Sequence, residues 1–161
     1  MSYDLEVLVT GRKKLKPLVI DNIRIEINPQ GGGRHRYHET FPYMAEVRGT
    51  WCSLFDTNIE NRCLSAFFIA KISKNVSEIP NPFWEDDYEK FVLNIRPEYQ
   101  QSFQNTLVHL QTFSPIKRIM FLPRLQGIEN NCVCGVISLN KFFELLESNK
   151  ILFNIVYIIQ N

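Results

Sequence analysis

The chain has 161 residues and a mass of 18.9 kDa, which suits one domain, 1–161, with a core of ordinary size. Hydrophobic residues make up 45% and charged residues 22%, a composition that excludes disordered and collagen-like chains. The 18 Lys and Arg residues against 17 Asp and Glu give a formal charge of +1, so no global field attracts nucleic acid or an anionic membrane.

The N-terminal region predicts three strands. Residues Tyr3–Thr10 place apolar side chains at every second position, as a strand with one buried face requires, and Gly11 ends the pattern. Leu15–Ile20 and Asn22–Asn28 predict two further strands, and Asp21-Asn22 is the turn between them.

Two long apolar stretches follow and predict core strands. They are Tyr43–Phe55 and Cys63–Ser73, and the polar residues Asp56–Arg62 between them suit a hairpin connection. The continuous apolar run inside the second stretch, Leu64–Ile72, is typical of a central strand that is buried on both faces.

The middle of the chain predicts two helices. Acidic residues at 85–87 suit the positive end of a helix dipole, and apolar residues follow at helical spacing, which predicts a short helix over 85–95. Pro97 suits the first turn of a second helix, which Ser114-Pro115 ends. The apolar positions of this second helix recur at intervals of four and three: Tyr99, Phe103, Leu107 and Leu110.

The last third predicts a hairpin followed by a helix and a final strand. Ile116–Leu122 and Cys132–Ile137 are the expected hairpin strands. Ser138 suits the cap of the helix, Asn149 suits its end, and Ile151–Ile159 returns as a strand. Because strands gather in the first half and helices in the second, we expect an α+β fold, a mostly antiparallel or mixed sheet packed against about three helices.

The N-terminus and the cysteines favour a cytoplasmic protein. Asp4 and Glu6 stand where a signal peptide carries basic and then apolar residues. The nine-residue run Ile151–Ile159 is far shorter than the roughly 20 residues that a membrane span needs. The four cysteines are then expected to be reduced thiols packed among apolar neighbours.

The segment Gly31–His38, with the sequence GGGRHRYH, is a candidate surface. Its glycines lack the spacing to a Lys and a Ser or Thr that a phosphate-binding loop needs. A nucleic-acid-binding module is the better motivated alternative, because Arg34 and Arg36 suit phosphate contacts while Tyr37 and His38, beside His35, suit stacking on bases. On a chain of almost neutral charge, a patch of this size is more often a solvated hairpin tip.

Metal and nucleophilic chemistry find weak support in the sequence. His35, His38 and the pair Cys132-x-Cys134 are of the types that bind zinc, but Cys52 and Cys63 stand too far apart to supply a second closely spaced pair. No motif places a thiol or hydroxyl beside a base. A small enzyme or zinc protein is therefore a second alternative only, and we expect no metal and no cofactor.

The segment Phe83–Tyr88 combines aromatic and acidic residues in a pattern that suits protein binding. Trp84 and Tyr88 are of the residue types that anchor interfaces, while Glu85, Asp86 and Asp87 suit the steering of a basic partner. The same acids also suit the first turn of a helix, and Trp84 is also of a type that fills cores. We take Trp84–Tyr88 as the first candidate for partner contact and Arg34–His38 as the second.

The last third of the chain resembles the ends of small bacterial immunity proteins. The resemblance is carried by FLPRLQG, Phe121–Gly127, and by CGVISLNKFFELLESNKILFNIVYII, Cys134–Ile159. It implies a cytoplasmic protein that binds and neutralises a cognate toxin domain by protein contact, without catalysis and without a membrane. Most of the matching positions are apolar and are expected in the core, so no contact residue follows from them. The oligomeric state and the strand order stay open.

Overall fold

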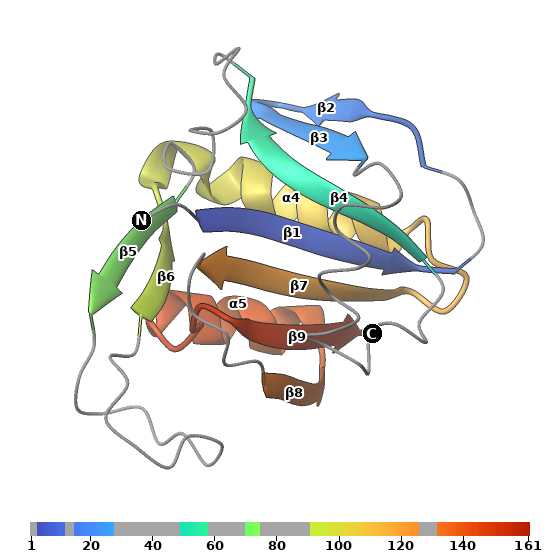
Figure 1. Cartoon of the computed structure of the whole chain (residues 1–161). Coiled ribbons are helices and arrows are strands. Elements are labelled where there is room, and N and C mark those ends of the chain that lie inside the picture. The colour runs from blue at the N-terminus through green and yellow to red at the C-terminus, as the bar shows by residue number, and fades with distance from the viewer. Residues whose placement is uncertain (1–2, 12–14, 28–48, 58–69, 75–90, 126–131) are drawn as a thin grey trace.

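The computed structural model describes residues 3–11, 15–27, 49–57, 70–74, 91–125 and 132–161 (Figure 1). It has an α+β fold, with a mixed sheet of seven strands, a separate pair of strands and two α-helices among these residues. The strands are β1 (Tyr3–Thr10), β2 (Leu18–Ile20), β3 (Ile23–Ile27), β4 (Gly49–Asp56), β5 (Ala70–Lys74), β6 (Phe91–Ile95), β7 (Arg118–Leu125), β8 (Cys132–Ile137) and β9 (Ile155–Gln160). The helices are α4 (Gln100–Gln111) and α5 (Leu139–Glu147), and a short 3-10 turn, η2 (Pro97–Tyr99), leads into α4.

The large sheet has the order β2-β3-β4-β1-β7-β9-β8. Neighbouring strands are antiparallel except β8 and β9, which are parallel. The first strand of the chain therefore lies at the centre of the sheet, where its register with β4 pairs Leu8 with Trp51 and its register with β7 pairs Leu8 with Met120.

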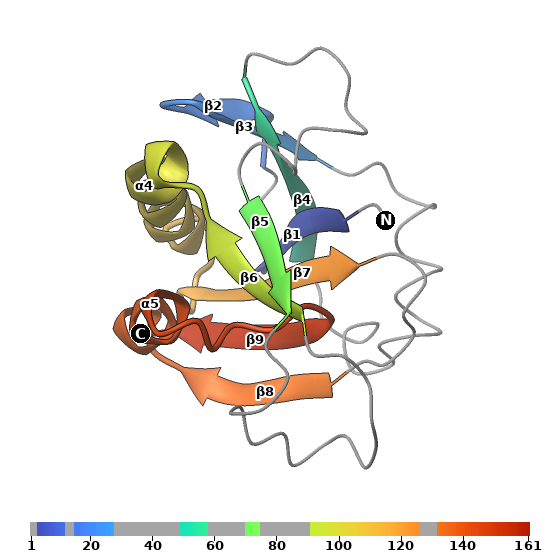
Figure 2. The same ribbon diagram turned by 90° about the vertical axis from the view of Figure 1, so that its left-hand side faces the viewer.

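Both helices cover the same face of this sheet, and β5 and β6 lie at one end of it (Figures 1 and 2). Aromatic rings from three elements join the helices to the sheet in edge-to-face contacts. Phe121 of β7 lies 5.5 Å from Phe103 of α4 and 5.4 Å from Phe142 of α5, measured between ring centroids. The same Phe142 ring lies 5.8 Å from Tyr157 of β9. This geometry is favourable for aromatic pairs, so these rings form the centre of the main core.

The opposite face of the sheet carries a second apolar cluster. It is formed by Leu8, Met120, Leu122, Val156 and Ile158, and Trp51 packs against it. The middle of the sheet is thus apolar on both faces, which explains why β7 and β9 are nearly continuous apolar runs rather than alternating ones.

The three predicted N-terminal strands are present, but β2 covers only Leu18–Ile20 of the predicted Leu15–Ile20. The β1 strand has the predicted bounds, and β2 and β3 pair across a turn in which Asp21 has a φ of 52°. The short polar side chain of an Asp tolerates this left-handed conformation better than most residues do. Gly11, directly after β1, has a φ of 122°, a conformation that side chains rarely adopt.

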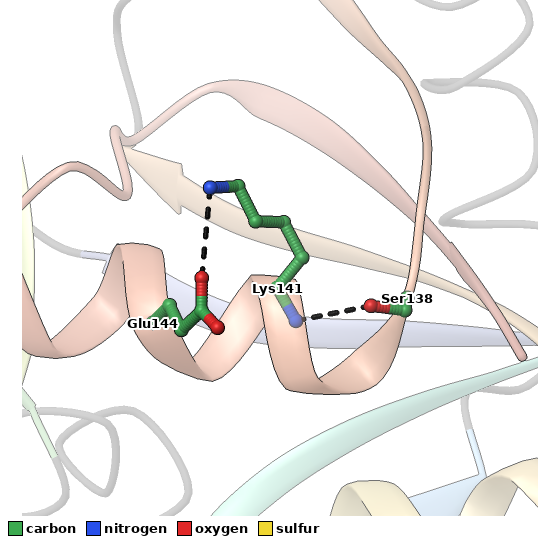
Figure 3. A network of polar contacts seen from close by, with 3 residues as sticks. All are labelled: Ser138, Lys141 and Glu144. Carbon is green, nitrogen blue, oxygen red and sulfur yellow. Dashed lines mark hydrogen bonds and ion pairs between the residues drawn. The ribbon is translucent and has the colours of Figure 1, made fainter.

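The two C-terminal helices are also confirmed. The α5 helix begins after Ser138, whose Oγ accepts a hydrogen bond from the Lys141 N–H at 3.1 Å, while Lys141 and Glu144 pair at 3.6 Å on the exposed side (Figure 3). Asn149 follows the helix with a φ of 57°. These are the local signals from which the sequence predicts both ends of the helix.

The helix predicted over 85–95 is wrong in its C-terminal half. Phe91–Ile95 is strand β6, paired with β5, and residues 85–90 lie outside the described part. The strand is also tied to the segment before β9, since Leu93 N–H donates to Ile151 O at 2.8 Å and Phe153 N–H donates to Phe91 O at 2.9 Å. The apolar residues of this segment fit the spacing of a helix as well as that of a strand. Backbone hydrogen bonds to segments distant in sequence stabilise the strand.

The strand order of the sheets shows that both predicted hairpins between long strands are wrong. The β4 strand lies between β3 and β1, whereas β5 pairs with β6 in the small sheet, so Ala70–Lys74 is not a central strand of the large one. Likewise β9 lies between β7 and β8. The cause in the second case is α5, because a helical crossover returns the chain parallel to β8 and places β9 beside it.

Candidate functional site

The two surfaces singled out from the sequence lie outside the described residues. Arg34–His38 falls within 28–48, and Trp84–Tyr88 falls within 75–90. Both stay predictions.

The described residues that flank these two segments lie at opposite ends of the large sheet. Gly49, after the first segment, pairs with Thr10 at the C-terminal end of β1. Phe91, after the second, is bonded to Phe153 beside the start of β9, at the other end of the sheet (Figure 1). Since strand residues rise about 3.3 Å each, the length of β1 separates these ends by roughly 20 Å. The described residues Gly49 and Phe91 are therefore well separated.

The described thiols are in surroundings that suppress nucleophilic chemistry. Cys52 is fully buried in β4, and this burial raises the pKa of its thiol to about 12. Burial also raises the pKa of the half-buried Cys134 thiol. Because the thiolate is the reactive form, burial makes both side chains less reactive.

Two further chemically versatile side chains of the described residues make contacts within the fold. The Tyr157 hydroxyl accepts a hydrogen bond from the Leu152 N–H at 2.8 Å, and burial raises its pKa. His109 is exposed on α4, with its ring 5.1 Å from that of Phe113. Among the residues that the structure describes, no three His, Cys, Asp or Glu side chains gather closely enough to hold a metal ion.

A row of polar side chains crosses the sheet on the face opposite the helices. Ser53 of β4 pairs with Glu6 of β1 on one side and with Glu26 of β3 on the other. Arg24 Nε lies 3.2 Å from Glu26 Oε1, an ion pair whose N–H is not aligned for a hydrogen bond, and the Arg24 guanidinium lies 5.6 Å from the centre of the Phe55 ring. Glu6 and Ser53 make further interactions within the chain. Most of this row therefore makes contacts within the chain, while the buried Arg24 Nη2 has no hydrogen-bond partner among the described residues.

The two edges of the large sheet differ in how they are protected. The β2 edge has three residues, and it lies between exposed residues at both ends: Lys16 and Pro17 before it and Asp21 after it. Short strands, charges and proline are the means by which natural sheets block pairing with other chains.

The β8 edge is longer, and its protection is limited to an irregularity between Val133 and Val136, where its register with β9 shifts. Its six residues, CVCGVI, carry no charge and no proline. Val136 is 54% exposed, and a Cβ added at Gly135 would meet no atom within 4 Å. This is the candidate docking site of the described residues. The sequence pattern predicts a hairpin between β7 and β8 and so does not reveal this edge; the helix that follows β8 was the available signal for a parallel crossover.

Comparisons of the chain with protein-family models, with curated proteins and with solved structures find no match. The described helices, of 12 and 9 residues, include none that is long and apolar enough to cross a membrane. The β8 edge is therefore the described feature on which a proposal of function can be built.

Proposed function

We propose that this chain is a binding protein of the immunity class, which neutralises a cognate toxin domain by covering part of its surface. The observation that carries the proposal is the uncharged, exposed β8 edge on an otherwise well-packed sheet. An inhibitor of this kind needs a rigid scaffold and an open contact surface, and it needs no reactive group.

The C-terminal resemblance to immunity proteins supports the proposal as well. Most of its matching residues lie in β7, β8, α5 and β9, and most of their described apolar side chains are buried or partly buried. These side chains belong to the core, so the resemblance is carried by core residues and does not identify the residues that contact a partner. Val136 is the exception, because it belongs to the matching stretch and is exposed.

The aromatic and acidic segment Trp84–Tyr88 supplies a second part of the proposal. Its acids suit long-range attraction to a basic toxin surface, and its aromatic residues suit burial on contact. Its described neighbour Phe91 is hydrogen-bonded to Phe153, close to the start of β9, which pairs in parallel with β8.

The test is affinity capture of the tagged chain from lysate of its native cells, with and without nuclease, followed by an activity assay of the captured protein. We expect a stoichiometric protein that survives nuclease and whose activity the chain inhibits. Glu85→Lys combined with Asp87→Lys should weaken its binding about tenfold and reduce the salt dependence. The matched control is Arg34→Ala combined with Arg36→Ala, in the second candidate segment.

Two results contradict the proposal. Loss of all bound material on nuclease treatment would favour the nucleic-acid-binding alternative, and then the arginine variant should lose binding steeply with salt. A captured protein whose activity the chain leaves unchanged would exclude inhibition.

A further inference from the structure

The Asn161 side chain, which follows β9, links the two helices to each other. Its Oδ1 accepts a hydrogen bond at 3.1 Å from the N–H of Leu139, the first residue of α5. Its Nδ2 donates at 3.3 Å to Oε1 of Gln111, the last residue of α4. The first N–H groups of a helix have no partner within the helix, so the bond to Leu139 satisfies a group that α5 cannot satisfy itself. One amide therefore contacts the end of one helix and the start of the other.

Gln111 also holds the turn that connects α4 to β7. Its Oε1 accepts from Asn161, and its Nε2 donates to Lys117 O at 3.3 Å. Lys117 has a φ of 52°, a left-handed conformation that persists in a lysine where the surrounding contacts hold it. Gln160 Nε2 donates to the neighbouring carbonyl, Ile116 O, at 2.9 Å. Side-chain amides from α4 and from β9 thus fix the same turn.

A closed ring of hydrogen bonds anchors this turn to the central strand of the sheet. The Thr10 hydroxyl of β1 donates to Arg118 O at 2.9 Å, and the Arg118 N–H donates to Ser114 Oγ at 3.1 Å. The Ser114 and Thr10 hydroxyls lie 3.0 Å apart. Because the single Thr10 proton serves Arg118 O, the Ser114 hydroxyl is the donor between them. The turn is therefore fixed to the sheet, and Gln111 and Asn161 connect both helix ends to this fixed point.

We infer that Asn161 and Gln111 form a lock that couples the end of α4, the turn at residues 114–117 and the first turn of α5, so that these three parts open together in the folded protein. Both amides use a donor and an acceptor at the same time, so the bond on one side of each amide orients the group that bonds on its other side. Loss of one bond should therefore weaken the next. The lock is independent of the proposed function, because none of its bonds involves a partner.

Asn161→Asp separates the lock from a simple helix cap. The variant keeps an acceptor for the Leu139 N–H and removes the donor to Gln111 Oε1. Exchange of the Leu139 N–H with solvent deuterium should not become faster, because a carboxylate near the start of a helix is favourable. Exchange of the Lys117 and Arg118 N–H groups, which bond to Ser114, should become about three- to fivefold faster, because Gln111 is then held less well. A cap without a lock would leave these two groups at wild-type rates.

Gln111→Ala tests the coupling in the opposite direction, from α4 to α5. It removes the acceptor of Asn161 Nδ2, so exchange of the Leu139 N–H should become about three- to fivefold faster. The Ser148 N–H, at the other end of α5, bonds within its own helix region and should keep its wild-type rate. The matched control is Gln100→Ala, which removes the same side chain from the first residue of α4 and should leave the Leu139 rate unchanged. Exchange resolved by residue in NMR spectra of the purified chain is the measurement.

Three results would overturn the inference. A wild-type Leu139 rate in Gln111→Ala, or wild-type Lys117 and Arg118 rates in Asn161→Asp, would show that the helix ends open independently. Equal acceleration of the Leu139 and Ser148 N–H groups in Gln111→Ala would show a general loosening of α5 instead of a lock. An effect of Gln100→Ala on Leu139 as large as that of Gln111→Ala would show that any loss of stability in α4 produces it.

Discussion

Two glycines of the large sheet tolerate a side chain very differently. At Gly11 the backbone has a φ of 122°, and an added Cβ would lie 2.6 Å from Pro115 Cδ. At Gly135 the φ lies outside the range that side chains avoid, and the added atom would meet nothing within 4 Å. The first glycine is required by the turn that ends β1, and the second is not required by local sterics.

We expect Gly11→Ala to lower the free energy of unfolding by about 2 kcal/mol, because strained backbone and a close contact act together. Gly135→Ala should leave it unchanged or raise it by up to about 1 kcal/mol, since alanine restricts the unfolded chain more than glycine does. Urea unfolding of both variants against wild type is the measurement. Equal destabilisation of the two would show that the turn at Gly11 relaxes to accept a side chain.

Elements with local signals were predictable from the sequence. Three such signals are the alternation of apolar residues in β1, their spacing by three and four in α4, and the Ser138 cap of α5. Each depends only on residues that are close together in the sequence. Such signals do not need the rest of the fold, so they gave the correct element.

Elements decided by distant partners were not predictable in the same way. The apolar residues of β6 suit a helix, and the hydrogen bonds between Phe91 or Leu93 and residues 151–153 make them a strand. The β8 edge also depends on pairing between segments that are distant in the sequence. The β8 edge exists because α5 returns β9 to the inner side of β8, and a local pattern of CVCGVI does not reveal which of its sides is paired.

The cap of α5 gives a direct test at the scale of one element. Ser138 Oγ accepts from the Lys141 N–H, whereas the Asn161 side chain accepts from the Leu139 N–H at 3.1 Å. Ser138→Ala removes only the first bond and should lower the free energy of unfolding by about 1 kcal/mol. Ser148→Ala, at the exposed C-terminal end, should change it by less than about 0.5 kcal/mol. If thermal unfolding shows equal effects, the cap bond does not stabilise the helix.

The sheet order ties the two ends of the chain into one structure. The central strand β1 is hydrogen-bonded to β4 and β7, and β7 is bonded to β9 at the C-terminus. Arg118 at the start of β7 also donates through Nη2 to Gln160 Oε1 at 2.8 Å. Removal of either end would expose the apolar faces of the strands that stay. The described sheet should therefore unfold as one cooperative unit.

In a sheet that unfolds as one unit, buried titratable groups make the stability of the whole molecule depend on pH. Cys52 in β4 and Tyr157 in β9 belong to the same core, and burial raises the pKa of both. The folded chain keeps the Cys52 proton up to about pH 12, whereas the unfolded chain loses it near the ordinary pKa of 9.0. The unfolded state then binds fewer protons, so stability is fully present below pH 9 and falls as the pH rises toward 12.

We expect the free energy of unfolding to fall above pH 9 with a contribution from Cys52 that approaches 1.4 kcal/mol per pH unit, about the value for one proton. Tyr157 should add to this above its ordinary pKa of 10.0. Urea unfolding from pH 8 to 10.5 measures the slope. Cys52→Ala should make the slope shallower, and Cys134→Ala, which removes a half-buried thiol, should reduce it less. An unchanged slope in Cys52→Ala would show that the core opens locally to release this proton before the sheet unfolds.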